Sequence, residues 1–296
     1  MIDHASNIRA PAVAGRFYEA DADRLRADAR RFTPDPPDDL ALPQALHGAL
    51  VPHAGWVCSG RIAGTVYRAL AKRTAARTLV LLGAVHTVRL DGPALENADA
   101  WHTPIGLAQI DADLRRILAA IPGFASFDMA HQYEHSLEVQ LPLILEAFGP
   151  DTKIVPCLIP PHPNAPDWGR AIGQTLAGQT HPILVIASSD LTHYGPNYNF
   201  TPQGAGRTGI DWAANVNDAR LLQLIEQMDP DAIVHDTQQH HSACGGGAIA
   251  AMIAAVQQLG ANHAVTLEHT NSARELAPLG HTDDNNAVGY AGVVFG

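Results

Sequence analysis

Cysteine and long apolar runs are both scarce in this sequence. Its 296 residues include three cysteines, Cys58, Cys157 and Cys244, and no two of them form a Cys-x-x-Cys pair. A sparse, odd set of this kind argues against a disulfide framework and favours a reducing compartment. No apolar run approaches the roughly 18 residues of a membrane helix, and the first residues lack the pattern of a signal peptide. We therefore expect a cytoplasmic protein without membrane association.

Basic residues are also few. The chain has 19 Lys and Arg against 30 Asp and Glu, which gives a formal net charge of −11. Nucleic-acid phosphates require clustered Lys and Arg, and the densest basic run, residues 24–31, is interleaved with acids. We expect no nucleic-acid partner. The sequence also lacks a Walker loop, a Gly-x-Gly-x-x-Gly turn, a Gly-x-Ser-x-Gly elbow and a His-Glu-x-x-His motif, so nucleotide binding and serine-hydrolase chemistry have no support.

An alternation of strand-like and helix-like segments fills the chain instead. Runs of branched apolar residues predict strands over residues 47–53, 78–82, 153–159, 183–187, 264–269 and 288–295. Helical spacing of apolar residues predicts helices over 19–32, 61–72, 111–121, 131–146, 167–176, 211–228 and 248–259. Strands that are apolar throughout are typical of parallel sheets covered on both faces. We predict an α/β fold, a single domain with a mainly parallel central sheet flanked by helices on both faces.

Three connecting regions carry local predictions. Residues 54–60, with glycine at both Gly55 and Gly60, predict a tight turn. Pro142 is expected either to kink the helix over 131–146 or to begin a second helix. Residues 195–209 are rich in Gly, Pro and Asn, and this stretch is long enough for a binding loop or lid.

Histidine is abundant, with 16 residues, and three of them follow predicted strands. These are His53, His86 and His193, the last after Ser188, Ser189 and Asp190. Open α/β sheets bind ligands in the crevice beyond the carboxyl ends of their strands, so these rings can share one crevice. Imidazole is a common ligand of Zn, Cu, Fe and Ni, and His53 and His86 are candidate metal ligands. The alternative is that each ring only caps a strand or binds a loop carbonyl.

Cys244 precedes three glycines that open the last predicted helix. A thiolate at a helix N-terminus is stabilised by the helix dipole, and glycines allow the backbone close to whatever the sulfur binds. Metal ligation is therefore one interpretation of Cys244. A buried, inert thiol and a nucleophilic cysteine are the other two.

His135, His193 and Asp190 are candidates for acid–base chemistry. His135 lies beside Glu134, and His193 comes three residues after Asp190, near enough for the acid to orient the ring. Asp190 has two alternative roles, as a metal ligand or as a turn residue. Three further histidines are interpreted as loop residues without a role in the site: His102, His240 and His241.

Several sequence blocks, in one order, resemble the Memo family. The blocks are Arg9-x-Pro-Ala-Val-Ala-Gly-x-Phe-Tyr18, Val51-Pro-His-Ala-Gly-Trp-Val-Cys-Ser-Gly60, Glu134-His-Ser-Leu-Glu-Val-Gln-Leu-Pro142, Ser188-Ser-Asp-Leu-Thr-His-Tyr-Gly195 and Cys244-Gly. Prokaryotic members of the family are called AmmeMemoRadiSam system protein B. The family is similar in fold to class III extradiol ring-cleaving dioxygenases, which hold a non-haem iron at the strand ends of an α/β sheet.

The resemblance implies roles for particular residues. His53 and His86 are expected to be metal ligands, and Cys244 stands where the dioxygenases have a carboxylate. His193 matches their acid–base histidine, and His135 and Asp190 are expected to line the pocket. Family members commonly have Gly-Pro-Ser-His or Gly-Pro-Asn-His where this chain has Gly83-Ala-Val-His86. Iron is the leading expectation for the metal, and copper or zinc would also suit a thiolate.

Two functions follow from these observations. The first is a metal-dependent oxidoreductase, dioxygenase-like, that acts on a small substrate with His193 moving protons. The second is non-catalytic: a protein that uses the same pocket to bind a peptide or partner, or to handle a metal. The family's prokaryotic name also implies a radical-SAM protein and an AMMECR-type protein as partners.

Overall fold

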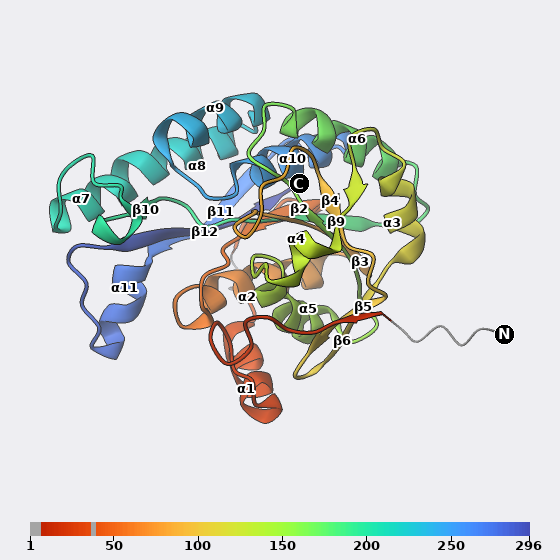
Figure 1. Ribbon diagram of the computed structural model, residues 1–296, viewed down its shortest axis with the longest axis horizontal. Helices are drawn as coiled ribbons and strands as arrows, with labels where there is room; N and C mark the ends of the chain where they lie inside the picture. Colours follow the sequence, from red (N-terminus) through yellow and green to blue (C-terminus); the bar gives the residue numbers. More distant parts are fainter. Residues whose placement is uncertain (1–6, 37–39) are drawn as a thin grey trace.

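A mostly parallel sheet forms the centre of the computed structural model, which describes residues 7–36 and 40–296 (Figure 1). Five neighbouring strands are all parallel, each to the next, in the order β6 (Gly106–Ile110), β8 (Lys153–Leu158), β3 (Thr78–Gly83), β9 (Ile183–Ser188) and β2 (Gly48–Val51). All residues of β2, β3 and β9 are buried. The predicted α/β fold with a mainly parallel sheet is confirmed.

Antiparallel and short strands extend this parallel core on both sides. On one side β12 (Ala287–Phe295) pairs antiparallel with β2, β11 (Ala264–Asn271) and β10 (His193–Tyr194). On the other side are β5 (Ala100–Thr103), which is antiparallel to β6, and β1 (Ile8–Arg9). Two further short strands, β4 (Ala94–Leu95) and β7 (Ala125–Ser126), pair with each other, and β4 also pairs with β8. The sheet is therefore mixed only outside its centre.

Helices cover both faces of the sheet, as Figure 1 shows. One face packs against α3 (Ala112–Ala119), α6 (Ala165–Ala177), α8 (Ala219–Glu226), α9 (Pro230–His240) and α10 (Gly246–Gln258). The other packs against α1 (Ala22–Phe32), α2 (Trp56–Arg73) and α5 (Leu141–Phe148). Shorter helices are α4 (Asp128–Gln132), α7 (Arg207–Trp212) and α11 (Ser272–Leu276). None of the helices in the described ranges is long and apolar enough to cross a membrane.

Strand side chains alternate between the two cores. In β9, Val185 belongs to the core under α6 and α10, whereas Ile186 belongs to the core under α2 and α5. This alternation explains why β9 is apolar at every position, because both faces are covered. Each fully buried Val, Leu or Ile side chain contributes about 1.5–3 kcal/mol relative to exposure.

The contact between α6 and α10 is close enough to exclude side chains. A Cβ atom added at Gly169 would collide with the carbonyl of Ala251, and one at Gly173 would collide with that of Ala255. The two helices therefore meet at their backbones, and α10 is buried along nearly all its length. This packing fixes the start of α10, two residues after Cys244.

Two local predictions are wrong. The helix predicted over 131–146 is interrupted: α4 ends at Gln132, η1 (Glu138–Gln140) follows, and α5 begins at Leu141. The carboxylate of Glu134 accepts hydrogen bonds from the next two backbone N–H groups, which an uninterrupted helix would need. Pro142 lies in the first turn of α5, so it begins a second helix. The turn predicted over 54–60 extends only to Gly55, because α2 begins at Trp56.

Candidate functional site

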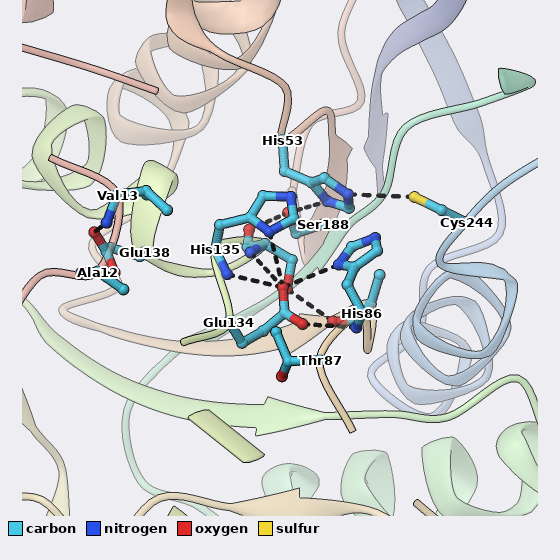
Figure 2. A network of polar contacts seen from close by, with 12 residues as sticks. Ala12, Val13, His53, His86, Thr87, Glu134, His135, Glu138, Ser188 and Cys244 are labelled. Atoms are coloured by element: carbon cyan, nitrogen blue, oxygen red, sulfur yellow. Dashed lines mark hydrogen bonds and ion pairs between the residues drawn. The ribbon is translucent and has the colours of Figure 1, made fainter. Parts of the chain in front are cut away.

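Three histidine rings converge beyond the carboxyl ends of neighbouring strands. His53 follows β2, His86 follows β3, and His135 lies in the non-helical stretch before η1. The three rings lie close together (Figure 2). The His86 and His135 rings are stacked with centroids 4.7 Å apart, and the His53 ring is edge-on to both, at 5.1 and 5.4 Å. One potential ligand atom from each ring lies within 4.8 Å of the others. Within residues 7–36 and 40–296, this is the one cluster of His, Cys and acidic side chains with such spacing.

Glu134 orients two of these rings. Its buried carboxylate accepts hydrogen bonds from the backbone N–H of His86 (2.7 Å), His135 (2.8 Å) and Ser136 (2.9 Å). The same carboxylate lies 3.0 Å from Nδ1 of His86 and 3.3 Å from Nδ1 of His135. Burial raises the pKa of Glu134, but these contacts outweigh burial and hold the pKa far below its usual range. An ionised Glu134 therefore fixes the His86 ring through Nδ1 and the His135 segment through its backbone N–H.

Ser188 orients the third ring. Its hydroxyl donates to the carbonyl of Ser136 (2.6 Å) and accepts from Nε2 of Gln140 (3.1 Å), which also donates to the carbonyl of Pro52. The serine has one proton, so its oxygen accepts from Nδ1–H of His53 at 3.1 Å. In the neutral ring Nε2 is then the nitrogen without a proton. The rings of His53 and His86 are thus each held through Nδ1.

Cys244 is adjacent to the histidine cluster. Its sulfur lies 3.2 Å from Nε2 of His53, a contact that Figure 2 shows as a dashed line. The backbone N–H of Cys244 donates to the carbonyl of Asp190 (3.3 Å), and that of Gly245 donates to the hydroxyl of Ser189 (2.9 Å). These bonds hold the start of α10 against the end of β9. The structure therefore brings the thiol to the ring predicted to share a metal with it.

The charges in the cluster depend on one another. Burial raises the pKa of the Cys244 thiol, but the contacts with His53, His193 and His86 lower it well below its usual value. Burial lowers the pKa of His86, yet its contacts with Cys244 and Glu134 raise it to about 10. The pKa of His135 is lowered to about 4, first by burial and then by the neighbouring imidazoles. The cluster without a metal is therefore a thiolate paired with imidazolium, beside a neutral His135.

His193 and Asp190 also lie beside the thiol. One carboxylate oxygen of Asp190 accepts from the backbone N–H of His53 (2.7 Å), and the other lies 3.9 Å from Nε2 of His193. That separation is too long for a hydrogen bond, and Nε2 of His193 is buried without a partner in the described structure. Asp190 thus ties β9 to the His53 segment, while a ring nitrogen of His193 is available to a ligand.

A cavity of about 320 Å³ adjoins the thiol and His193. The predicted binding loop forms part of its wall through Tyr198 and Phe200, whose rings lie 5.0 Å from His193 and 5.3 Å from His241 respectively. No Lys or Arg lines it. Its lining is Leu191, His193, Tyr198, Asn199, Phe200, His241, Ala243 and Cys244. The cavity has the size and the aromatic wall that suit a small, uncharged ring.

The N-terminal arm forms the remaining wall of the site. The guanidinium of Arg9 is buried against the carboxylate of Glu138 (2.8 Å) and donates to the carbonyl of Glu134 (2.8 Å). The ring of Phe17 packs against that of His135, with centroids 4.7 Å apart. The first sequence block and the Glu134–Pro142 block are therefore in direct contact. Together they hold the segment that carries Glu134 and His135.

The six residues predicted for the site lie in one region, but sequence reasoning missed the groups that orient them. Those six are His53, His86, His135, Asp190, His193 and Cys244. Glu134 and Ser188 were visible only as neighbours of predicted residues. His241, interpreted as a loop residue, lines the cavity. His102 is an exposed residue of β5, and His240 ends α9. The metal-ligand and acid–base roles remain predictions.

Comparisons with known proteins agree along almost the whole chain. The family model described as Memo-like protein matches residues 9–294. A MEMO1 family protein of Thermococcus kodakarensis is 33% identical over 97% of this chain and 99% of its own length. Those of Methanopyrus kandleri and Aquifex aeolicus are 32% and 30% identical, again over 97% of this chain and over 98% and 99% of their own lengths.

A solved structure shows the same fold. An uncharacterized protein from Escherichia coli K12 superposes with a TM-score of 0.50 at 12% identity, over 85% of this chain and 100% of that one. At this identity the likeness concerns the fold alone. The family match and the relatives cover the sequence blocks that build the histidine cluster, the thiol and the arm around them. This chain therefore belongs to the Memo family.

Proposed function

We propose that the chain binds a transition-metal ion at His53 and His86, with Cys244 as the third ligand, and uses it in oxidative chemistry on a small substrate. The observation that carries the proposal is the orientation of the rings. The two proposed imidazole ligands, His53 and His86, are each held through Nδ1 by a protein oxygen. Metal-binding histidines are held in this way, because the outer hydrogen bond fixes the tautomer and the direction of the ligating nitrogen.

The donor set suits iron, copper or zinc. Imidazole nitrogens bind all three metals, and a thiolate adds softness that favours copper and zinc. Iron is the first candidate, since the resemblance to non-haem iron enzymes motivates it. His135 is the alternative third ligand, because its ring belongs to the three-histidine cluster. When bound, the ion would supply Lewis-acid and redox chemistry.

The side chains around the cavity support a proton-transfer role for His193. We assign His193 as the residue that takes or delivers a proton, because its Nε2 is buried, has no hydrogen-bond partner among the described residues, and lies beside Cys244 at the cavity wall. The carboxylate of Asp190, 3.9 Å from Nε2 of His193, would stabilise the imidazolium form by its charge. His135 would act beside them as a neutral ring, and Tyr198 and Phe200 would exclude water from the substrate.

Cobalt titration of chelator-treated protein tests the metal site. His53→Ala should lower Co²⁺ affinity by at least about 100-fold, since it removes a ligand and leaves the Ser188 oxygen without the Nδ1–H donor of His53. The matched control is His102→Ala, which removes an exposed histidine of β5 and should bind cobalt as the wild type does. Cys244→Ser and His135→Ala identify the third ligand, because only the ligand's loss should remove cobalt. Equal affinity in all variants would contradict the proposal.

Oxygen uptake with catechols tests the reaction. His193→Ala should keep its metal and lose turnover, because it removes the proton-transfer group but no ligand. Loss of metal with unchanged turnover per bound ion would contradict the role of His193. Screening should begin with uncharged or monoanionic aromatic substrates, since no Lys or Arg lines the cavity.

A non-catalytic role is the second candidate. The ring of Tyr198, at the cavity wall, is 41% exposed, which suits contact with a peptide or partner protein. A radical-SAM protein and an AMMECR-type protein are the partners proposed under this function. Metal binding without oxygen uptake on any aromatic substrate, together with partner binding that Tyr198→Ala abolishes, would favour this second function.

A further inference from the structure

A π-helical turn interrupts the helical segment over residues 207–226. Between α7 and α8, residues Ala213–Asp218 form η3, a π-helix. The wider turn buries two consecutive polar residues, Asn217 and Asp218, which are 0% and 1% exposed. Turns of this type are rare and are frequent at functional sites. Neither residue belongs to the histidine cluster or to the cavity wall.

Both residues bind Thr192, which immediately precedes His193. The carboxylate of Asp218 accepts from the backbone N–H of Thr192 (3.0 Å), and the amide of Asn217 donates to its hydroxyl (2.9 Å). The approach of Asp218 requires glycine at position 289 in β12, because a Cβ on Gly289 would collide with the carboxylate. The π-turn therefore holds Thr192 through two hydrogen bonds, next to the proposed proton-transfer residue His193.

Asn217 also reaches the segment that carries the thiol. The same amide nitrogen donates to the carbonyl of His240 (3.0 Å), at the end of α9 and four residues before Cys244. Its oxygen accepts from the guanidinium of Arg220 (2.6 Å), which fixes which end of the amide is the nitrogen. Both amide protons are therefore used, one on each segment.

A second contact continues the connection toward Cys244. Arg220 also donates to the carboxylate of Asp236 (2.5 Å), and the other oxygen of Asp236 accepts from the hydroxyl of Ser242 (2.6 Å). Ser242 is fully buried and lies two residues before Cys244. The turn between α9 and α10 is thus connected through Asp236 and Arg220 to Asn217, which binds Thr192.

We propose that Asn217 is a positioning residue that couples the His193 segment to the Cys244 segment. It sets the distance between the two through one side chain bonded to both. The inference deepens the proposed function, on which its catalytic consequence rests. The coupling itself is a property of the protein without metal. It predicts that a change at Asn217 disturbs residues 189–194 and 241–246 together.

Amide hydrogen exchange of the metal-free protein tests the coupling. Asn217→Asp has the same shape but no amide donor, so the bond to the carbonyl of His240 is lost and a carboxylate faces that carbonyl, while the hydroxyl of Thr192 can turn to donate to the carboxylate. We expect exchange about tenfold faster in both segments, the effect of one lost buried hydrogen bond. The control is Thr103→Val, which removes a buried hydroxyl bond of 2.8 Å in β5 and should leave both segments unchanged.

A milder variant separates coupling from general loosening. Thr192→Val keeps the side-chain shape and removes only the oxygen to which Asn217 donates. It should speed exchange in residues 241–246, a segment that the substitution itself does not alter. Faster exchange in residues 189–194 alone, or in neither segment, would overturn the proposal, and this variant decides the question if Asn217→Asp does not fold.

Cobalt affinity gives the readout that connects the coupling to the site. If the proposed function is correct, Asn217→Asp should bind cobalt about tenfold more weakly than Thr103→Val. Losses of this size are typical when a residue that positions a metal ligand, without binding the metal itself, is changed. Equal affinity of the two variants would contradict a positioning role at the metal. A wild-type protein that binds no cobalt would contradict the proposed function, while the exchange comparison would still decide the coupling.

Discussion

Glu134→Gln tests the orientation of two proposed metal-site rings with one substitution. Glutamine keeps the size of the side chain but replaces one acceptor oxygen and the charge with an NH₂ group. That group cannot accept from the N–H donors of His86, His135 and Ser136, which surround the carboxylate. Loss of the outer partner of metal-bound histidines lowers metal affinity about 10- to 100-fold, or about 1.4–2.8 kcal/mol. The metal-free protein should lose about 1–3 kcal/mol of stability, since a buried donor is left unsatisfied.

Competition with a coloured chelator measures the metal affinity, and urea unfolding measures the stability of the metal-free protein. The control is Glu96→Gln, which changes another buried carboxylate whose partners include the backbone N–H of Asn97 and no histidine. Its metal affinity should equal that of the wild type. Equal affinity of Glu134→Gln and Glu96→Gln would refute the argument that Glu134 orients the ligands.

Three predictions concern stability. Burial and, after it, a neighbouring carboxylate raise the pKa of Glu96 from 4.5 to about 7. A carboxyl group whose pKa is higher in the folded than in the unfolded chain stabilises the fold less as the pH rises through this window. The wild type should therefore lose about 3 kcal/mol more of its free energy of unfolding than Glu96→Gln between pH 4.5 and 7. If the urea-unfolding midpoints of the two proteins changed in parallel with pH, the prediction would be wrong. Arg9→Met leaves Glu138 buried without its cation and should lower the free energy of unfolding in urea by about 3–5 kcal/mol. A loss below about 1 kcal/mol would refute the argument that the buried Arg9–Glu138 ion pair holds the segment. Gly169→Ala should destabilise the protein by about 1–3 kcal/mol and lower its Tm, because the new Cβ atom collides with the carbonyl of Ala251. An unchanged Tm would contradict the close contact of α6 and α10.

Much of the fold could be predicted because the strands are apolar on both faces. The run of Ile183–Ser188 and its counterparts in β3 and β8 has one pattern with one explanation, a covered parallel sheet. The helix over 131–146 failed because a single side chain, Glu134, competes for backbone donors, and periodicity does not register that competition. Strand order depends on pairing between distant segments, which no local pattern encodes.

In the candidate site too, residues placed by local sequence pattern could be predicted, and residues placed by contacts between distant segments could not. His53, His86 and His193 were predictable because β2, β3 and β9 are parallel neighbours whose carboxyl ends share one edge. The groups that hold them were not, because each acts across a long sequence separation: Ser188 binds His53, and Asn217 binds Thr192. A polar residue becomes a positioning residue through its partner, which only the folded chain identifies.

The metal content of protein purified without oxygen or chelators tests the central claim most directly. Elemental analysis should find close to one iron or copper ion per chain in the wild type. It should find almost none in His53→Ala and the normal amount in His102→Ala. A wild-type protein that carries no metal and takes up none when iron, copper or zinc is added would contradict the account, and the pocket would then serve binding alone.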